Sequence, residues 1–406
     1  MNIVQVEQIF KDTAYARVSG SAEELKCANY LKDKCTEMGL EARLEEFEVD
    51  LADMESAEFI VDGRSIPCKG YFGCGSGEVT APLYYMPQDD RFSLEGCKGK
   101  IVLNDGSMGY WRYQDLLENG AVGFITYDGN ANYMDEDMAQ RTLRAEVSKG
   151  NKIPGVHINA KQAIELVKNG PAEAIIRIQQ KEYKGKSHNV VLDLPGEREE
   201  MIVITAHYDS TVLSQGAYDN MSGCIGLLGI AEKFAREHHH YSLRIVWCGS
   251  EESGLVGSKA YVEAHDEELG KMVLNINLDM LGCIMGRFMA CCTCEQRMVH
   301  YMQYLAAIER FAVNAYQDVR SSDSTSFADK GMPAVSFARY APENTANIHN
   351  RYDTAKVMSA EQLLRDIHFI NCYVAQMANA KKCPVSGEMP ENMKEKLDIY
   401  LTRKRG

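Results

Sequence analysis

Short apolar runs alternate with stretches of helical spacing in the second half of the chain. Residues 201–206, 242–248 and 272–278 are three such runs, and β-branched residues are frequent in the first. Short, nearly continuous apolar runs of this kind are typical of parallel strands buried on both faces. Residues 222–236 instead place apolar side chains along one helical face. This alternation predicts an α/β fold with a mixed, mostly parallel central sheet flanked by helices.

The rest of the chain divides by pattern. Residues 1–50 read as two helices and a half-buried strand, and Ser21 with Glu24 has the spacing of a capping box before the second helix. From about residue 52 to 180, short strands and glycine-rich turns predict a separate β-rich domain. We therefore expect a discontinuous catalytic domain (1–51 and 181–385), an inserted domain (52–180) and a C-terminal arm (386–406).

Composition narrows the choice of function. The chain has 406 residues, of which 45% are hydrophobic and 25% charged, and its net charge is −14. A protein with this net negative charge is not expected to bind nucleic acid or an anionic membrane surface. We see no signal peptide and no apolar run long enough to span a membrane, so we expect a cytoplasmic protein. The 13 cysteines are then expected to be reduced.

Acids and histidines follow the ends of three predicted strands, and one more histidine comes later. The set is His207, Asp209, Asp219, Glu251, Glu252, Asp279 and His349. Because the carboxyl ends of parallel strands meet at one edge of a sheet, we expect these side chains to lie close together. Imidazole nitrogen and carboxylate oxygen are zinc ligands. Two histidines and three carboxylates suit two zinc ions that share one carboxylate.

The spacing of these residues resembles the zinc peptidase family M28. The resemblance covers residues 1–50 and about 185–380 and rests on five motifs: His207-x-Asp209, Asp219-Asn220-x-Ser222-Gly223, Glu251-Glu252-x-Gly254, Leu278-Asp279-Met280, and His349 ahead of Asp353-Thr354. It implies the fold of the zinc-dependent exopeptidases. The insert, 52–180, looks like a protease-associated domain, which this family often carries at that point.

The resemblance also implies a role for each metal ligand. His207 and Asp279 would bind one zinc ion, and Glu252 and His349 would bind the other. Asp219 would bridge the two ions. A cis peptide bond is implied between Asp219 and the next residue.

Two further acids receive catalytic roles from the resemblance. Glu251 would be the general base that moves the proton from water to the leaving amine. Asp209 would hold the His207 imidazole in the right tautomer.

The chain departs from the family pattern at two positions. Ile348 stands where many relatives have a tyrosine that stabilises the oxyanion, and Ser324 stands where many have a histidine. The oxyanion donor is therefore open. The alternatives are the second zinc ion alone or one of four tyrosines: Tyr208, Tyr218, Tyr340 and Tyr352.

The function that these observations favour is a dizinc aminopeptidase acting on short peptides with a free N-terminus. A carboxypeptidase or dipeptidase of the same family is the first alternative, and it would need an arginine for the substrate carboxylate, with Arg287, Arg320 and Arg339 as candidates. The others are a metal-free binding protein on the same fold and a single-zinc glutaminyl cyclase. Cobalt could replace zinc, and the sequence leaves the oligomeric state open.

Overall fold

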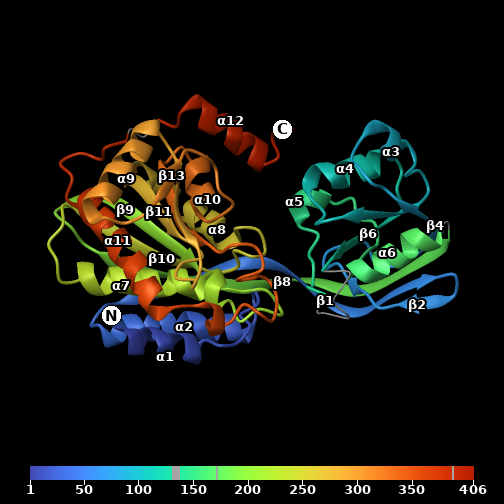
Figure 1. Cartoon of the computed structure of the whole chain (residues 1–406), viewed down its shortest axis with the longest axis horizontal. Helices are drawn as coiled ribbons and strands as arrows, with labels where there is room; N and C mark the ends of the chain where they lie inside the picture. The colour runs from blue at the N-terminus through green and yellow to red at the C-terminus, as the bar shows by residue number, and fades with distance from the viewer. Residues whose placement is uncertain (130–137, 171, 386–387) are drawn as a thin grey trace. The chain divides into compact units, whose positions relative to one another are not determined.

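The computed structural model describes residues 1–129, 138–170, 172–385 and 388–406, in two compact units (Figure 1). The first unit comprises Met1–Val49 and Lys186–Lys404 with Gly406, and the second comprises Asp50–Gly185 with Arg405. The predicted boundaries were 51/52 and 180/181. Both divisions fall inside long strands, β1 (Ala42–Val61) and β8 (Glu173–Leu194), each of which continues from one unit into the other.

The sheet of the first unit is mixed and mostly parallel, as the sequence predicts. Its strand order is β13-β12-β14-β11-β9-β10-β8, where β9 is parallel to both β10 and β11, and β11 is parallel to β14. Antiparallel pairs occur toward its sides, at β10–β8 and β12–β14. The strands are β9 (Arg198–His207), β10 (Tyr241–Cys248), β11 (Met272–Leu278), β12 (Arg287–Thr293), β13 (Asn314–Tyr316) and β14 (Ala334–Tyr340).

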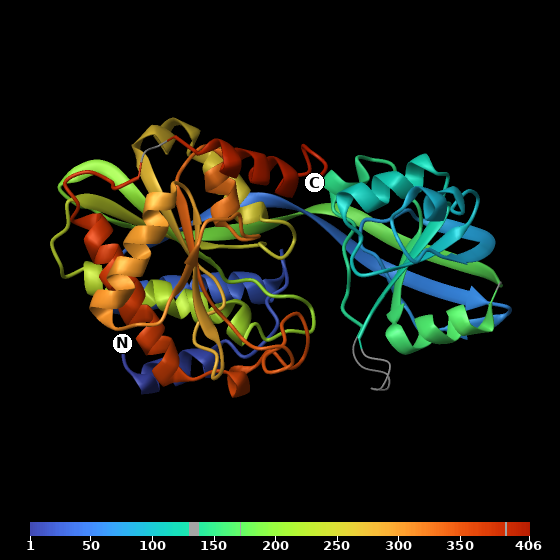
Figure 2. The same cartoon turned by 45° about the horizontal axis from the view of Figure 1, so that its top comes forward.

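Helices cover both faces of this sheet (Figures 1 and 2). They are α1 (Ile3–Asp12), α2 (Ala22–Glu37), α7 (Ser222–Phe234), α8 (Val256–Ala264), α9 (Gln296–Glu309), α10 (Ser324–Asp329) and α11 (Ala360–Ala378). Helices α1, α2, α7, α9 and α11 share one core, and α8 and α10 belong to another.

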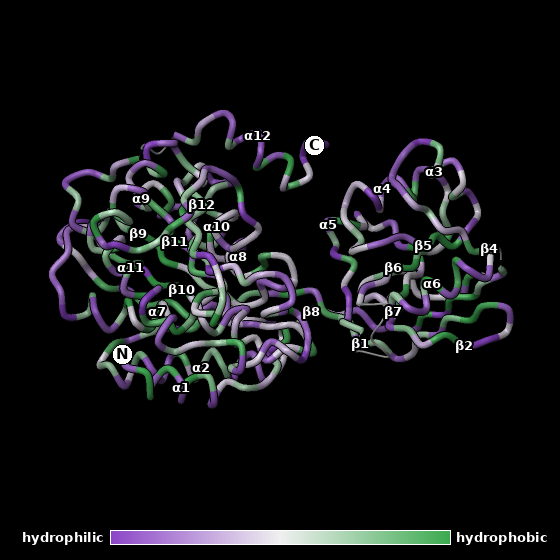
Figure 3. Tube along the Cα trace, in the orientation of Figure 1, coloured by the Kyte–Doolittle hydropathy of each residue, from purple (hydrophilic) through white to green (hydrophobic). Residues whose placement is uncertain are grey.

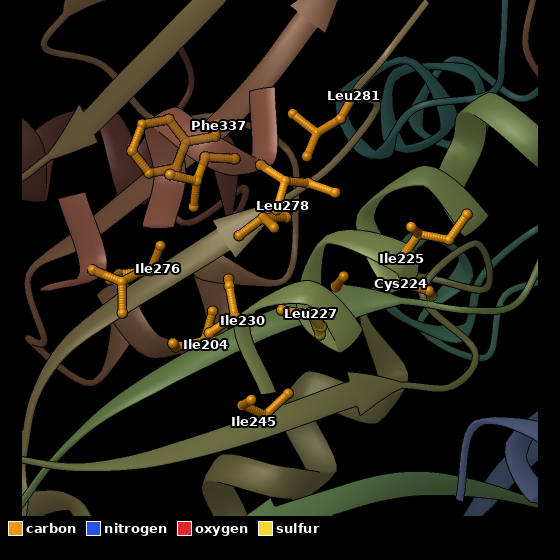
Figure 4. Close-up of a cluster of buried hydrophobic side chains, with 14 of the residues drawn as sticks. Ile204, Cys224, Ile225, Leu227, Ile230, Ile245, Ile276, Leu278, Leu281 and Phe337 are labelled. Atoms are coloured by element: carbon orange, nitrogen blue, oxygen red, sulfur yellow. The ribbon is translucent and has the colours of Figure 1, made fainter. Parts of the chain in front are cut away.

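Alternate residues of the central strand face these two cores. Ile202 and Ile204 of β9 join the larger core with α7, part of which is shown in Figure 4, whereas Val203 joins the smaller core with Tyr261 and Phe327. Apolar side chains are therefore needed at consecutive positions. In Figure 3 the hydrophobic colour is accordingly concentrated along the strands of this sheet.

The second unit has its own sheet and core. Strands β4 (Gly77–Tyr85), β5 (Ile101–Asp105), β6 (Gly123–Asp128) and β7 (Gly155–Asn159) are parallel neighbours, and β4 also pairs antiparallel with the first part of β8. Short pieces β2 (Arg64–Ile66) and β3 (Lys69–Gly70) lie at its margins, with helices α3 (Arg91–Glu95), α4 (Tyr110–Glu118), α5 (Ala145–Ser148) and α6 (Ala160–Asn169). The parallel strands of this unit are accompanied by these four helices. The unit therefore contains more helix than the glycine-rich turns of its sequence suggested.

The C-terminal segment is part of the first unit rather than a separate arm. Helix α12 (Glu391–Tyr400) buries Met393 and Leu397 against Ala328 and Ala334, beside α10 (Figure 2). Its apolar spacing stabilises this docking. Residues 386 and 387, where the predicted arm begins, lie outside the described residues. No helix within the described ranges is long and apolar enough to cross a membrane.

Candidate metal centre

The register of the parallel strands brings the predicted residues to one edge. His207 ends β9 and pairs with Cys248, the last residue of β10, so the Glu251-Glu252 turn begins beside it. Strand β11 runs parallel to β9 on the other side and is followed directly by Asp279. Three successive elements thus deliver polar side chains to the same edge of the sheet.

Two clusters of ligand atoms meet at this edge and share Asp219. In one, His207 Nε2 lies 3.0 Å from Asp219 Oδ1 and 3.7 Å from Asp279 Oδ1. In the other, His349 Nε2 lies 3.1 Å from Asp219 Oδ2 and 3.1 Å from Glu252 Oε1. Within each cluster the ligand atoms all lie within 4.8 Å of one another. Asp219 therefore presents a different oxygen to each cluster.

These separations fit a zinc ion. Bond lengths of about 2.0–2.2 Å to nitrogen and oxygen place neighbouring ligands of a tetrahedral ion roughly 3.3 Å apart. The distances from each histidine to its carboxylates lie close to this value. The donor set, imidazole plus carboxylate with open positions, is also typical of catalytic zinc.

The electrostatics of the clusters favour positive charge. Burial by itself lowers the pKa of His349, but hydrogen bonds to Asp219 and Glu252 outweigh burial and raise that pKa to about 11. The pKa of His207 is likewise raised well above its usual value, because the surrounding acids outweigh burial. Burial also raises the pKa of Glu252, and the nearby Asp219 carboxylate adds to the shift. Cations bound among these acids would replace the protons that the side chains otherwise need.

Asp209 lies beside His207 and holds the turn after β10. Its buried carboxylate accepts hydrogen bonds from the backbone N–H groups of Glu251 (2.9 Å) and Glu252 (3.1 Å), and its Oδ1 lies 3.4 Å from His207 Nδ1. Asp209 thus lies beside the imidazole of His207, and the role that the resemblance implies for it stays a prediction. Its contact with the turn was not predicted, because backbone donors leave no signal in the sequence.

Glu251 stands apart from the ligands. Within the described part of the chain its carboxylate has no hydrogen-bond or ion-pair partner. Burial raises the pKa of Glu251 well above its usual value, and the neighbouring Glu252 carboxylate adds to the shift while His207 opposes it. A carboxyl group with a raised pKa and no fixed partner is suited to accept and donate a proton.

Glu24 also lies in this region, although the sequence indicated only a helix-capping role for it. The Ser21 side chain does accept from the Glu24 N–H (3.1 Å), but the capping box is only half formed. The buried Glu24 carboxylate accepts instead from Ser250 N (2.9 Å), Ser250 Oγ (3.0 Å), Ser187 Oγ (2.9 Å) and Gly20 N (2.7 Å). Burial, with a contribution from Asp209, raises the pKa of Glu24 to about 8. It fixes the residue directly before Glu251.

Asp353 supports the bridging residue in a similar way. Its carboxylate accepts from the backbone N–H groups of Tyr218 (2.7 Å) and Asp219 (3.1 Å). The peptide bond between Asp219 and Asn220 is cis, so that prediction is confirmed. The Asn220 amide then donates to Leu278 O (2.9 Å), which ties the bridge to the end of β11.

Of the three arginines weighed from the sequence, Arg320 reaches the centre. Its Nη2 donates to the Asp279 carbonyl (3.3 Å) and to Asp279 Oδ2 (3.2 Å). Arg339 pairs with Asp366 on α11, and Arg287 is exposed. Arg320 is therefore already engaged by a ligand of the first cluster.

One departure from the family pattern, Ser324, has a structural counterpart, and two of the candidate oxyanion donors make hydrogen bonds of their own. The Ser324 hydroxyl lies 2.8 Å from each of the Ser322 and Ser336 hydroxyls, a buried chain in place of an imidazole. The Tyr208 hydroxyl donates to His188 O (2.7 Å), and the Tyr218 hydroxyl donates to Arg339 O. Two of the four candidate tyrosines are thus already committed.

Comparison with known proteins agrees with this geometry. Residues 189–374, which contain all seven predicted site residues, match the model of peptidase family M28. Residues 189–374 are therefore similar to peptidase family M28. The matched segment lies wholly in the first unit, so the likeness of the second unit to a protease-associated domain stays a prediction.

Curated proteins similar to this chain include two bacterial aminopeptidases. Aminopeptidase YwaD of Bacillus subtilis is 28% identical over 278 residues, which are 66% of this chain and 58% of YwaD. The "Probable lipoprotein aminopeptidase LpqL" of Mycobacterium tuberculosis is 26% identical over 65% of this chain and 55% of its own length. The chain therefore matches little more than half the length of these relatives. One relative is named a lipoprotein, and the cytoplasmic location of this chain stays a prediction.

Solved structures show the same fold. An aminopeptidase from Aneurinibacillus sp. strain AM-1 superposes with a TM-score of 0.76 at 22% identity, covering 95% of this chain and 96% of that one. A zinc aminopeptidase from Bacillus subtilis gives a TM-score of 0.76 at 23% identity, covering 96% and 97%. At this identity the likeness establishes the fold alone.

Proposed function

We propose that this protein is a family M28 aminopeptidase that uses two zinc ions to hydrolyse the N-terminal peptide bond of short peptides. The observation that carries the proposal is the position of Asp219, which presents one oxygen to each of two histidine–carboxylate clusters. The relatives named above are aminopeptidases, and one solved structure of this fold is a zinc aminopeptidase. Cobalt, which accepts the same ligands, is the alternative metal.

In this proposal each residue of the edge has one task. His207 and Asp279 would hold one ion, Glu252 and His349 would hold the other, and Asp219 would serve both. Two zinc ions held in this way would supply a water of lowered pKa and polarise the scissile carbonyl.

The proton is moved by Glu251. Its carboxylate takes the proton from the attacking water and then passes it to the leaving amine. Asp209 and Glu24 keep Glu251 in place, since they hold the backbone of the turn on both of its sides.

The hydrogen bonds of the tyrosines reduce the number of candidate oxyanion donors. The Tyr208 and Tyr218 hydroxyls donate to backbone carbonyls, which disfavours both as oxyanion donors. Tyr340, Tyr352 and the metal itself stay as the alternatives. The Tyr340 ring lies 4.9 Å from the Arg320 guanidinium, which in turn contacts Asp279. Tyr352 is 51% exposed, close in sequence to His349.

The named relatives favour a free amine as the recognised group, since both are named as aminopeptidases. A carboxypeptidase would need an arginine available to the substrate, and Arg320 is engaged by Asp279. We therefore favour the aminopeptidase over the carboxypeptidase or dipeptidase.

A parallel assay with three substrates tests the proposal. Leucyl-4-nitroanilide should be cleaved, whereas an N-acetylated dipeptide should not. A peptide with an N-terminal glutamine should be shortened by one residue rather than cyclised. Cleavage of the blocked dipeptide would favour the carboxypeptidase, cyclisation the glutaminyl cyclase, and a metal-free, inactive protein the binding module.

We also propose that the second unit is a protease-associated domain that contributes no metal ligand. Neither cluster of the centre contains a residue of this unit among the residues described. Its parallel strands β5–β7 with flanking helices support the assignment. A metal-loaded crystal structure with a ligand from residues 52–180 would contradict it.

A further inference from the structure

A third cluster of metal-ligand side chains lies on α9 and α11. The cluster consists of Glu309, the last residue of α9, with His368 and Cys372 of α11, and its ligand atoms lie within 4.8 Å of one another. The Cys372 Sγ is 3.9 Å from His368 Nε2. Neither helix carries a ligand of the centre described above.

The cluster has a rigid base. His368 and Cys372 are four residues apart, so they lie on the same face of α11. The residues that follow them are buried: the Phe369 ring stacks on Phe311, with centroids 4.8 Å apart, and the Tyr373 hydroxyl contacts Met298 Sδ at 3.3 Å. Packing on both turns thus fixes the face that carries the two ligands. Preorganised ligands lower the entropic cost of binding an ion.

The charges of the cluster favour a cation. The carboxylate of Glu309 sits at a helix C-terminus, where the helix dipole disfavours negative charge. Burial raises the pKa of the Cys372 thiol, and the Glu309 carboxylate raises it further, partly offset by Lys233 of α7. A bound cation would relieve the repulsion between carboxylate and thiolate. His368 is exposed and the other two are half-buried, so an ion can enter from solvent.

We propose that Glu309, His368 and Cys372 form a third metal site that binds a divalent cation of the zinc class. Thiolate, imidazole and carboxylate together suit Zn²⁺ or Co²⁺, whereas Mg²⁺ and Ca²⁺ prefer oxygen ligands alone. Three protein ligands leave one tetrahedral position for water. The site is independent of the peptidase function proposed above.

Cobalt titration of the full-length protein tests this proposal. A cobalt–thiolate bond gives a near-ultraviolet charge-transfer band, and the centre with Asp219 has no sulfur among its five ligands. The wild-type protein should show this band and bind one Co²⁺ more per chain than Cys372→Ser. Cys383→Ser is the matched control, because Cys383 is also half-buried but its Sγ faces Val273 O. It should keep both the band and the extra ion.

His368→Gln provides a second variant that alters an exposed side chain. It should weaken binding of the extra Co²⁺ on the order of 100-fold. Peptidase activity should stay at the wild-type level, as in Cys372→Ser. Absence of the band in the wild-type protein, or its persistence in Cys372→Ser, would overturn the proposal. An inactive protein that still showed the band would instead refute the peptidase function alone.

Discussion

Each unit has a buried histidine near the carboxyl end of a parallel strand, but the two histidines have different surroundings. In the second unit, His157 of β7 lies 2.8 Å from Thr126 Oγ1 through Nδ1 and 3.0 Å from Asp128 Oδ1 through Nε2. Asp128 also pairs with Arg141. Burial raises the pKa of Asp128, but His157 and Arg141 outweigh it and the net shift is downward.

In the first unit, His207 meets an excess of acids. Asp209, Asp219 and Asp279 all lie within 4 Å of its ring nitrogens. Arg320 contacts Asp279, and the acids still raise the pKa of His207 strongly. A histidine–aspartate pair at a strand end therefore favours a metal when carboxylates outnumber the cations of the protein itself. Where an arginine balances the acid, the pair is a structural contact.

The largest effect that this comparison predicts is on catalysis at the acid-rich edge. Glu251→Gln should lower kcat by about 10²- to 10⁴-fold, because proton transfer is lost. Zinc content should stay at the wild-type value. Glu252→Gln is the control, and it should lower the zinc content by one ion. Equal loss of metal in both variants, measured by atomic absorption, would contradict the division of roles.

Removal of the metal should destabilise the first unit and leave the stability of the second unit unchanged. At zinc concentrations 100-fold above Kd, each bound ion stabilises the first unit by about 2.7 kcal/mol. Chelation should therefore lower hydrogen-exchange protection in β9, β10 and β11 and leave β5, β6 and β7 unchanged. An equal loss in both sets of strands would show that metal binding does not depend on the acid excess of one unit.

Glu24→Gln should have a smaller effect, confined to the turn before Glu251. Glutamine has one accepting oxygen where the carboxylate has two, so it cannot accept from both Ser250 N and Gly20 N, and the turn should shift slightly. We expect kcat to fall by about tenfold, equivalent to about 1.4 kcal/mol, with KM and zinc content little changed. Glu23→Gln, an exposed neighbour on α2, is the control and should behave as the wild-type protein. An unchanged kcat in Glu24→Gln would remove Glu24 from the positioning residues.

His157→Asn should affect only the stability of the second unit. Loss of the contacts to Thr126 and Asp128 should cost about 1–3 kcal/mol, measured as reduced exchange protection in β6 and β7. Because the folded pKa of Asp128 is lowered, its contribution is present above the unfolded value of about 3.9 and is lost as the pH falls further. This acid-induced loss should be smaller in the variant. A change in zinc content would contradict the structural role of His157.

The sequence by itself was sufficient for the central sheet and for naming the acids and histidines that meet at one edge of it. Strands β9, β10 and β11 carry nearly continuous apolar runs because both of their faces are buried, and such runs are visible without any partner. The acids and histidines could be named because each follows a strand or belongs to a motif of fixed spacing. Helix α7 begins at Ser222 as expected, directly after Asp219 and Asn220.

Only the tertiary structure decided which distant groups meet. The continuation of β1 and β8 through both units was missed, because the pattern of a half-exposed strand does not change at a domain boundary. Glu24 was read as a cap, since helix-start signals are local, whereas its contact with Ser250 joins residues 226 positions apart. The Glu309, His368 and Cys372 cluster arises only from the packing of α9 on α11. Contacts between elements depend on packing in three dimensions, which local periodicity does not encode.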